Sequence, residues 1–287
     1  MNDETKHAIG EVIEKTVEAA EETVRQPFFK PLARLGFYSK GFLFIVIGVL
    51  AILLVVGLDG GKIADATGAL AAVSDRPFGK VLLIIFIVGA VAHGTWNILR
   101  GAADIDDAGK NWLGIIKRSI SVITGFFYLG LAISAIEIIV AVRDTDGSSQ
   151  AEETFISLVL AVPVLGALFI GLVGLGVIGA GFHECYSGVT GKFRENYRLW
   201  EITGFHLTFI NVLGVLSFTA RALILVLMGY FFVRAAVYHN TGAIGMDAAL
   251  LVLLRSSYGR LLVLLTAIGL FCHGVLAFYE ARYRRIC

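Results

Sequence analysis

Two histidines in matching sequence contexts are the first residues of this chain to suggest chemistry. His93 and His273 each precede a glycine inside an apolar stretch, and a shift of 180 positions superimposes the two stretches. Neutral imidazoles at one depth of a membrane can serve as the axial ligands of a b-type haem. Hydrogen bonding between packed helices explains the same pattern. We expect the hydrogen-bonding role, with no cofactor and no metal, and keep haem b as a minor alternative.

Charged residues inside the apolar stretches are the other candidates. Glu137 lies six residues before Arg143, and a carboxylate within hydrocarbon marks a functional site by default. So close to the end of its stretch, however, Glu137 can extend to water. Lys40 and Arg221 occupy matching positions, where they either reach cytoplasmic lipid phosphates or line a central pathway. We favour contact with the solvated boundary for all three.

The chain shows no sign of an enzyme site. No sequence resembles a nucleophile elbow, a metalloprotease helix or a P-loop. The glycine spacing within LVGLGVIGAG superficially matches a dinucleotide-binding loop, but no strand precedes it and no βαβ unit surrounds it. We therefore expect no catalytic residues.

The composition is that of a membrane protein. Of 287 residues, 57% are hydrophobic and 16% are charged, whereas soluble domains average about 25% charged residues. The mean hydropathy is +0.79. The bilayer must therefore be the solvent for most of the chain. With 24 basic and 23 acidic residues, no excess positive charge favours nucleic-acid binding.

Six apolar runs are long enough to cross a bilayer, at about residues 38–58, 80–100, 118–142, 156–181, 214–236 and 260–280. Because lipid cannot satisfy backbone polar groups, these runs must form helices, and the fold class is an all-α transmembrane bundle. Lys and Arg are concentrated on the side that holds both termini. This distribution predicts that both termini are cytoplasmic.

The six runs form three repeats of two helices. Residues 74–101 recur as residues 255–282, and a weaker copy lies between them, aligned through Gly166, Gly181 and Gly188. The predicted units are residues 33–108, 109–192 and 208–286, within a membrane domain over 32–287. Because each unit crosses the membrane twice, all three have the same polarity, and we expect a pseudo-threefold axis along the membrane normal.

Several shorter segments have features of surface helices. Residues 67–73 and 246–254 are too short to span and are predicted to lie along the outer interface. Residues 2–25 have the periodicity of an amphipathic helix within a cytoplasmic segment over 1–31, and Gln26–Pro31 is expected to end it. Residues 190–207 carry aromatic residues among charges and predict another surface helix. The N-terminal helix and residues 190–207 are the candidate surfaces for a protein partner or a second copy.

The fourth span is unusually rich in glycine. Small residues allow close helix approach in lipid. Because Gly171, Gly174 and Gly181 are not expected to face one partner, we predict that this helix is buried among several neighbours.

Motifs in each repeat resemble those of a bacterial family. The pattern R-L-G-F-x-x-K/R-G at residues 34–41 is followed by G-A-L at 68–70 and P-F-G-K/R-x-L-L at 77–83. This combination is similar to the six-helix membrane proteins described as a domain of unknown function, DUF1206. The resemblance covers roughly residues 33–286 and implies six helices in a bacterial inner membrane, without an activity. The long acidic N-terminus, Thr124 at a usually basic position and the intramembrane histidines depart from the family pattern.

Two functional hypotheses follow. The first is a non-catalytic scaffold, accessory subunit or lipid-associated bundle, favoured by the sparse polarity of the spans. The second is a transporter or channel with a pathway along the repeat axis, favoured by polar residues at repeated depths. The contents of the space between the three repeats distinguish them.

Overall fold

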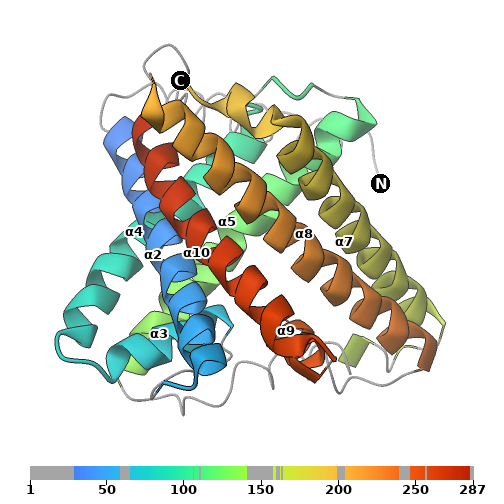
Figure 1. The fold of residues 1–287 in the computed structure, drawn as a ribbon. Helices are drawn as coiled ribbons and strands as arrows, with labels where there is room; N and C mark the ends of the chain where they lie inside the picture. The colour runs from blue at the N-terminus through green and yellow to red at the C-terminus, as the bar shows by residue number, and fades with distance from the viewer. Residues whose placement is uncertain are drawn as a thin grey trace.

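The structure is a computed structural model that describes residues 29–58, 65–105, 107–109, 111–140, 158–159, 162, 164–198, 204–238, 246–255 and 257–284. Six long helices in these ranges are apolar enough to cross a membrane. They are α2 (Phe29–Val56), α4 (Gly79–Ala102), α5 (Trp112–Ile139), α7 (Leu165–Thr190), α8 (Phe205–Tyr238) and α10 (Gly259–Tyr283). The predicted all-α bundle of six membrane helices is confirmed (Figure 1).

Two helix boundaries differ from the prediction. The fourth span was predicted over 156–181, but α7 runs from Leu165 to Thr190. The apolar residues before Pro163 resemble a span in composition, yet a proline lacks the N–H that a helix interior needs. Of the break predicted over Gln26–Pro31, residues 29–31 belong to α2, contrary to the prediction, and the rest lies outside the described residues.

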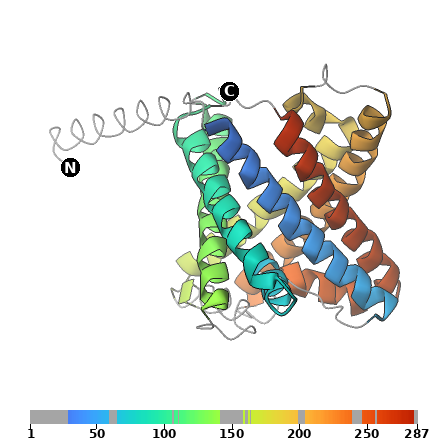
Figure 2. The same cartoon turned by 90° about the vertical axis from the view of Figure 1, so that its left-hand side faces the viewer.

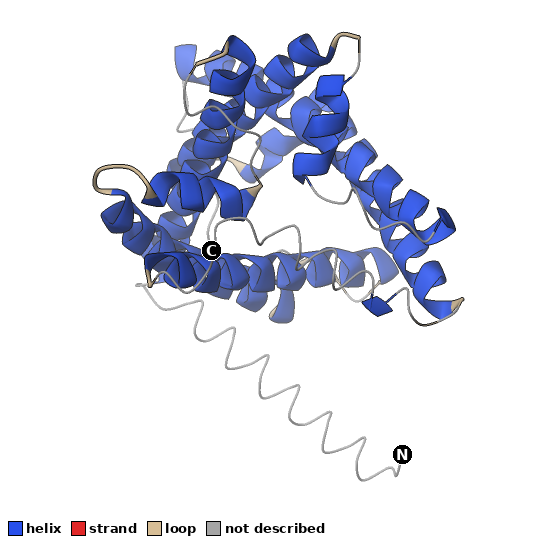
Figure 3. Ribbon diagram, turned by 90° about the horizontal axis from the view of Figure 1, so that it is seen from below, coloured by secondary structure: helices blue, strands red, loops and turns tan. Residues whose placement is uncertain are grey.

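The long helices pack as three close pairs, α2 with α10, α4 with α5, and α7 with α8. Figure 3 shows these pairs as the three sides of a triangle. Each pair meets where a side chain is missing or small. A Cβ on Gly274 would lie 2.7 Å from the carbonyl oxygen of Gly41, and a Cβ on Gly94 would lie 2.8 Å from that of Gly125. A Cβ on Gly181 would lie 3.0 Å from that of Ala222. These positions align in the predicted repeats, so the three pairs share one register.

The pairs are joined unequally at the corners of the triangle. α2 packs against α4, and α8 packs against α10, but α5 and α7 make no comparable contact among the described residues. The predicted pseudo-threefold axis therefore stays a prediction, with one corner that departs from it.

The glycines of α7 face one partner, contrary to the prediction. Gly171, Gly174 and Gly181 all approach α8, where the nearest atoms belong to Ala236, Gly229 and Val226 respectively. A Cβ on Gly176 or Gly179 would have no described atom within 4 Å. Only 22% of the most apolar 18-residue stretch of α7 is buried in the protein. α7 is therefore a peripheral helix that packs on α8 and exposes its remaining faces to lipid.

The two predicted short helices are present as α3 (Ala66–Ser74) and α9 (Met246–Arg255), and their place along the outer interface stays a prediction. Both lie at the end of the bundle opposite the start of α2 and the end of α10 (Figure 1). Gly79 and Gly259 begin the following long helices directly beneath the last carbonyls of α3 and α9. A side chain at either glycine would collide with that backbone, which explains why this glycine recurs in the repeat.

The described part of residues 190–207 is not a surface helix. A short 3₁₀ helix, η1 (Lys192–Asn196), is followed by an antiparallel bridge between Tyr197 and Arg284. Phe193 and Tyr197 are buried against α8 and α10, because they fill the space between these helices rather than face water. This burial raises the pKa of the Tyr197 phenol well above its usual value. Figure 2 shows the bundle from the side. The predicted helix over residues 2–25 lies outside the described residues.

Candidate functional site

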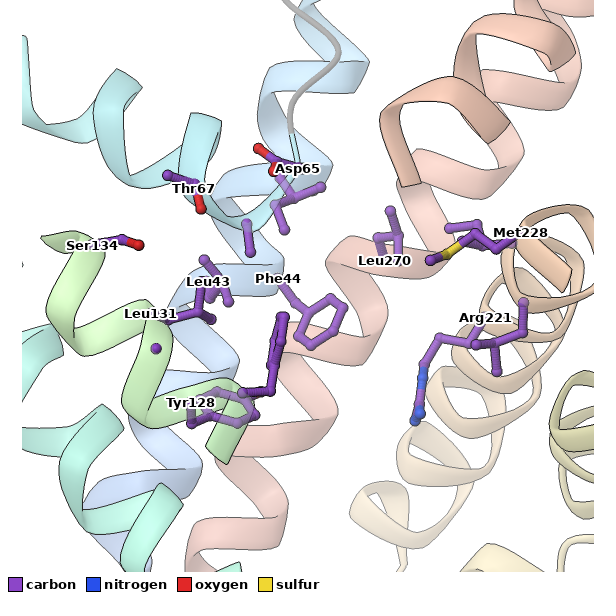
Figure 4. Close-up of a pocket in the computed structure, with 16 residues that line it drawn as sticks. Leu43, Phe44, Asp65, Thr67, Tyr128, Leu131, Ser134, Arg221, Met228 and Leu270 are labelled. Carbon is purple, nitrogen blue, oxygen red and sulfur yellow. The ribbon is translucent and has the colours of Figure 1, made fainter. Parts of the chain in front are cut away.

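A cavity of about 560 Å³ lies between the helix pairs. Its walls come from α2, α3, α5 and α8, with one residue from α10 (Figure 4). The first helix of every repeat therefore contributes to it. The cavity occupies the central space that the sequence hypotheses left open, and its contents decide between them.

Equivalent positions of the three first helices build the wall. In the repeat alignment Lys40, Thr124 and Arg221 correspond, and the residues three, four and seven positions further on all line the cavity. This spacing selects one face of a helix. The resulting layers are Leu43, Phe127 and Ile224, then Phe44, Tyr128 and Leu225, then Ile47, Leu131 and Met228. Apart from the Tyr128 hydroxyl and the Met228 sulfur, all three layers are hydrocarbon.

Charged groups occur only at the margins of the cavity, and both are already engaged. The Arg221 guanidinium lies 3.1 Å from a carboxylate oxygen of Glu184 on α7. The Asp65 carboxylate accepts a hydrogen bond of 2.7 Å from the Gly68 N–H and so caps α3. Figure 4 shows Arg221 on the far side of the cavity from Asp65 and Thr67. The cavity is therefore an apolar space with one ion-paired guanidinium and one hydrogen-bonded carboxylate at its margins.

Lys40 does not line the cavity, although it corresponds to Arg221. Its ammonium group donates to Glu280 across 3.0 Å, and Arg284 lies 3.4 Å from the other oxygen of the same carboxylate. The side chains of Lys40 and Glu280 are only 16% and 12% exposed. The two basic residues singled out in the sequence therefore each form an ion pair, Lys40 with Glu280 and Arg221 with Glu184. Both pairs join the helices of a close pair.

The two histidines are packed separately, each against an aromatic residue of the second layer of the cavity wall. The His273 ring lies edge-on to Phe44 at 4.6 Å, and the His93 ring lies edge-on to Tyr128 at 4.5 Å. Ser217 makes a hydrogen bond of 2.7 Å with Nδ1 of His273. Gly36 occupies the position equivalent to Ser217, so Nδ1 of His93 has no such partner among the described residues. The predicted interhelical hydrogen bond is present for His273 alone.

The remaining candidates lie elsewhere. Glu137 is in the last turn of α5, is partly exposed and does not line the cavity. Within the described ranges no three His, Cys, Asp or Glu side chains come together as a metal site would require. The expectation of no cofactor stays a prediction, and haem b stays its minor alternative, with His93 and His273 as the candidate ligands.

Sequence reasoning missed Glu184 and Asp65. Because the fourth span was placed too early, Glu184 fell just beyond it, whereas α7 includes this residue. The repeat alignment could have placed Glu184 within the span, since the second copy of the repeat extends to Gly188. Asp65 precedes a short apolar helix, the position where a capping carboxylate is expected.

Comparison with known proteins finds a family that two of the repeats resemble. The model of the family described as Domain of Unknown Function (DUF1206) matches residues 35–104 and 216–284. Two segments of the chain are thus similar to the DUF1206 domain. The predicted resemblance is thereby confirmed, and the two DUF1206 segments coincide with the first and third repeats. The middle repeat, 109–192, lies outside the match.

A relative with the same extent supports this assignment. The uncharacterised protein YxxB of Bacillus subtilis (strain 168) is 27% identical over 262 residues, which cover 91% of this chain and 93% of the relative. No solved structure matches the chain. The chain, whose six apolar helices are those of an integral membrane protein, therefore has a bacterial relative of nearly the same length.

Proposed function

We propose that this DUF1206 chain is a non-catalytic protein of the bacterial inner membrane that holds a hydrocarbon chain of a lipid in its central cavity. The three layers of aliphatic and aromatic side chains in the wall are the observation that supports the proposal. At about 560 Å³, the cavity is within the roughly 300–1,000 Å³ range of ligand pockets, which are lined mainly by apolar residues.

The polarity of the cavity favours lipid over water or ions. A buried water needs two to four polar partners, and the three layers offer few. Arg221 is paired with Glu184, and the Asp65 carboxylate is engaged in capping α3, so neither group is free to bind an ionic ligand in the centre of the cavity. We therefore expect the cavity to select an apolar chain with little preference for the head group. The excess of Lys and Arg at the start of α2 and the end of α10 supports a cytoplasmic position for both termini.

A tryptophan that fills the cavity tests the proposal. Leu225 lines the cavity at the position where the other repeats carry Phe44 and Tyr128, so an aromatic ring fits the local backbone. Purified Leu225→Trp should lose lipid that native mass spectrometry detects on the unmodified protein. Leu216→Trp is the matched control, because Leu216 is on the same helix and 42% exposed outside the cavity. Equal lipid retention by the two variants would contradict the proposal.

A transporter is the second candidate, favoured by the central position of the cavity and the opposite placement of Arg221 and Asp65 at its margins. It requires that a solute reach the cytoplasmic side past the Lys40–Glu280 pair. Proteoliposomes that hold the purified protein should then show solute flux, and Leu225→Trp should abolish it. Flux that survives this substitution would place any pathway outside the cavity.

A further inference from the structure

A second pocket lies at the end of the bundle where α2 begins and α10 ends. Its volume is about 410 Å³, and it is lined by Arg34, Tyr38, Arg198, Ala281 and Arg282. Three of these five residues are arginines, and none of the described lining residues is acidic. Arg34 and Arg282 form no ion pair with another described residue, in contrast to Arg221 beside the central cavity. The pocket therefore has the electrostatic character of an anion site.

The backbone holds this pocket in place. The Arg198 N–H donates to the carbonyl oxygen of Tyr283 at 2.8 Å, and Nη2 of Arg198 donates to the carbonyl oxygen of Arg282 at 2.9 Å. These bonds fix the segment after η1 against the last turn of α10. Arg34 and Tyr38 are four residues apart, so they share one face of α2. The three arginines thus come from two helix ends and a tethered segment.

Comparison between the repeats shows that Arg34 is not needed for helix capping. Its equivalent, Arg118, donates to the last carbonyls of α4, those of Gly101 and Ala102, at 2.8 and 2.7 Å. At the end of α10 the corresponding carbonyl, that of Arg282, accepts from Arg198 instead. Arg34 makes no hydrogen bond or ion pair with any other described residue. Its charge is therefore available to a ligand.

We propose that this pocket binds the phosphate group of an acidic phospholipid in the adjoining leaflet. Guanidinium groups match the geometry of phosphate oxygens. Basic pockets between membrane helices on the cytoplasmic side are known to hold acidic head groups. The span of α2 begins at Ala33, directly before Arg34, and Arg282 lies in the last turn of α10, so the arginines stand at head-group depth.

The aromatic residues beside the pocket favour a lipid over a soluble anion. Tyr38 is 41% exposed, and its ring lies 5.4 Å from that of Phe278, one turn before Arg282. These rings extend an apolar surface from the arginines toward the hydrocarbon. An acyl chain attached to the bound phosphate can cover that surface, whereas inorganic phosphate cannot.

The test measures lipid binding to the purified full-length chain at low salt. Phosphatidylglycerol, phosphatidylcholine and inorganic phosphate are titrated separately, and bound ligand is quantified by native mass spectrometry. Arg34→Gln and Arg282→Gln should each weaken phosphatidylglycerol binding by about fivefold, the equivalent of one basic residue near a membrane surface. Arg260→Gln is the control, since Arg260 is exposed at the opposite end of α10.

Each other result counts against the site. Equal affinity for phosphatidylcholine, or binding unchanged in Arg34→Gln and Arg282→Gln, would overturn the proposal. Inorganic phosphate bound as well as phosphatidylglycerol would overturn the lipid assignment. An equal loss in Arg260→Gln would show that net charge, not the pocket, attracts the lipid. Leu225→Trp should leave the excess of phosphatidylglycerol over phosphatidylcholine binding unchanged even where it lowers total lipid binding, so this outcome is independent of the central cavity.

Discussion

The contact between α7 and α8 provides the sharpest test of how this bundle is held together. A Cβ added to Gly229 of α8 would lie 2.6 Å from the carbonyl oxygen of Gly174 and 2.8 Å from the amide nitrogen of Ile178. Both atoms belong to the α7 backbone, which cannot move aside as a side chain can. To restore ordinary contact at 3.4 Å, the helices must separate by about 0.8 Å along this line. Gly229→Ala should therefore weaken the pair.

The magnitude follows from two opposing effects. Added methyl groups in a packed core cost about 1–3 kcal/mol, and alanine favours a helix interior over glycine by about 0.5–1 kcal/mol. Gly176→Ala on α7 has only the second effect, because its Cβ would meet no described atom within 4 Å. Since the helix preference is common to both variants, the free energy of unfolding should differ between them by about 1–3 kcal/mol.

Reversible unfolding in mixed detergent micelles measures this difference. Gly229→Ala should unfold at a lower denaturant fraction than the unmodified protein, and Gly176→Ala should match or exceed it. If the two alanine variants were equally stable, close backbone approach would not be what holds α7 on α8. The same result would contradict the role assigned to the glycine contacts of Gly274 with Gly41 and of Gly94 with Gly125.

Two further predictions concern charge and topology. Glu280→Gln should destabilise the protein by about 3–5 kcal/mol because it leaves Lys40 without its carboxylate. Adding Lys40→Met should restore most of that loss in the same unfolding assay. Equal stability of the single and double variants would refute this prediction. In intact cells, a membrane-impermeant maleimide should label the exposed position of Asp75→Cys but not that of Glu195→Cys until the membrane is opened. The reverse pattern would place both termini outside.

The sequence was sufficient for the helices because a bilayer leaves few alternatives. An apolar run of about 20 residues must be helical, so length and composition located α4 and α10 to within a few residues. The same reasoning misplaced α7, since hydropathy alone does not distinguish the residues before Pro163 from those after it. Repeated glycine was the better guide there, because it records backbone contact instead of apolarity.

The central cavity could not be predicted from the sequence. Its wall depends on which face of each first helix turns inward, and apolar residues cover every face of a membrane helix. The hydropathy pattern thus does not mark an inner face, and the exposed Ile133 is as apolar as the buried Leu131 two residues before it. The partners of Lys40 and Arg221 depend on the same register, so their ion pairs became visible only in three dimensions.

The differences between repeats indicate what kind of ligand the cavity suits. The close helix contacts recur in all three pairs, but the polar side chains near them do not. Lys40, Thr124 and Arg221 share a position, and only Arg221 lines the cavity. An ion needs charged or polar partners, and from this layer the cavity receives only a guanidinium that Glu184 already pairs. A flexible, uncharged hydrocarbon chain has no such requirement, which supports the proposal of lipid as the occupant.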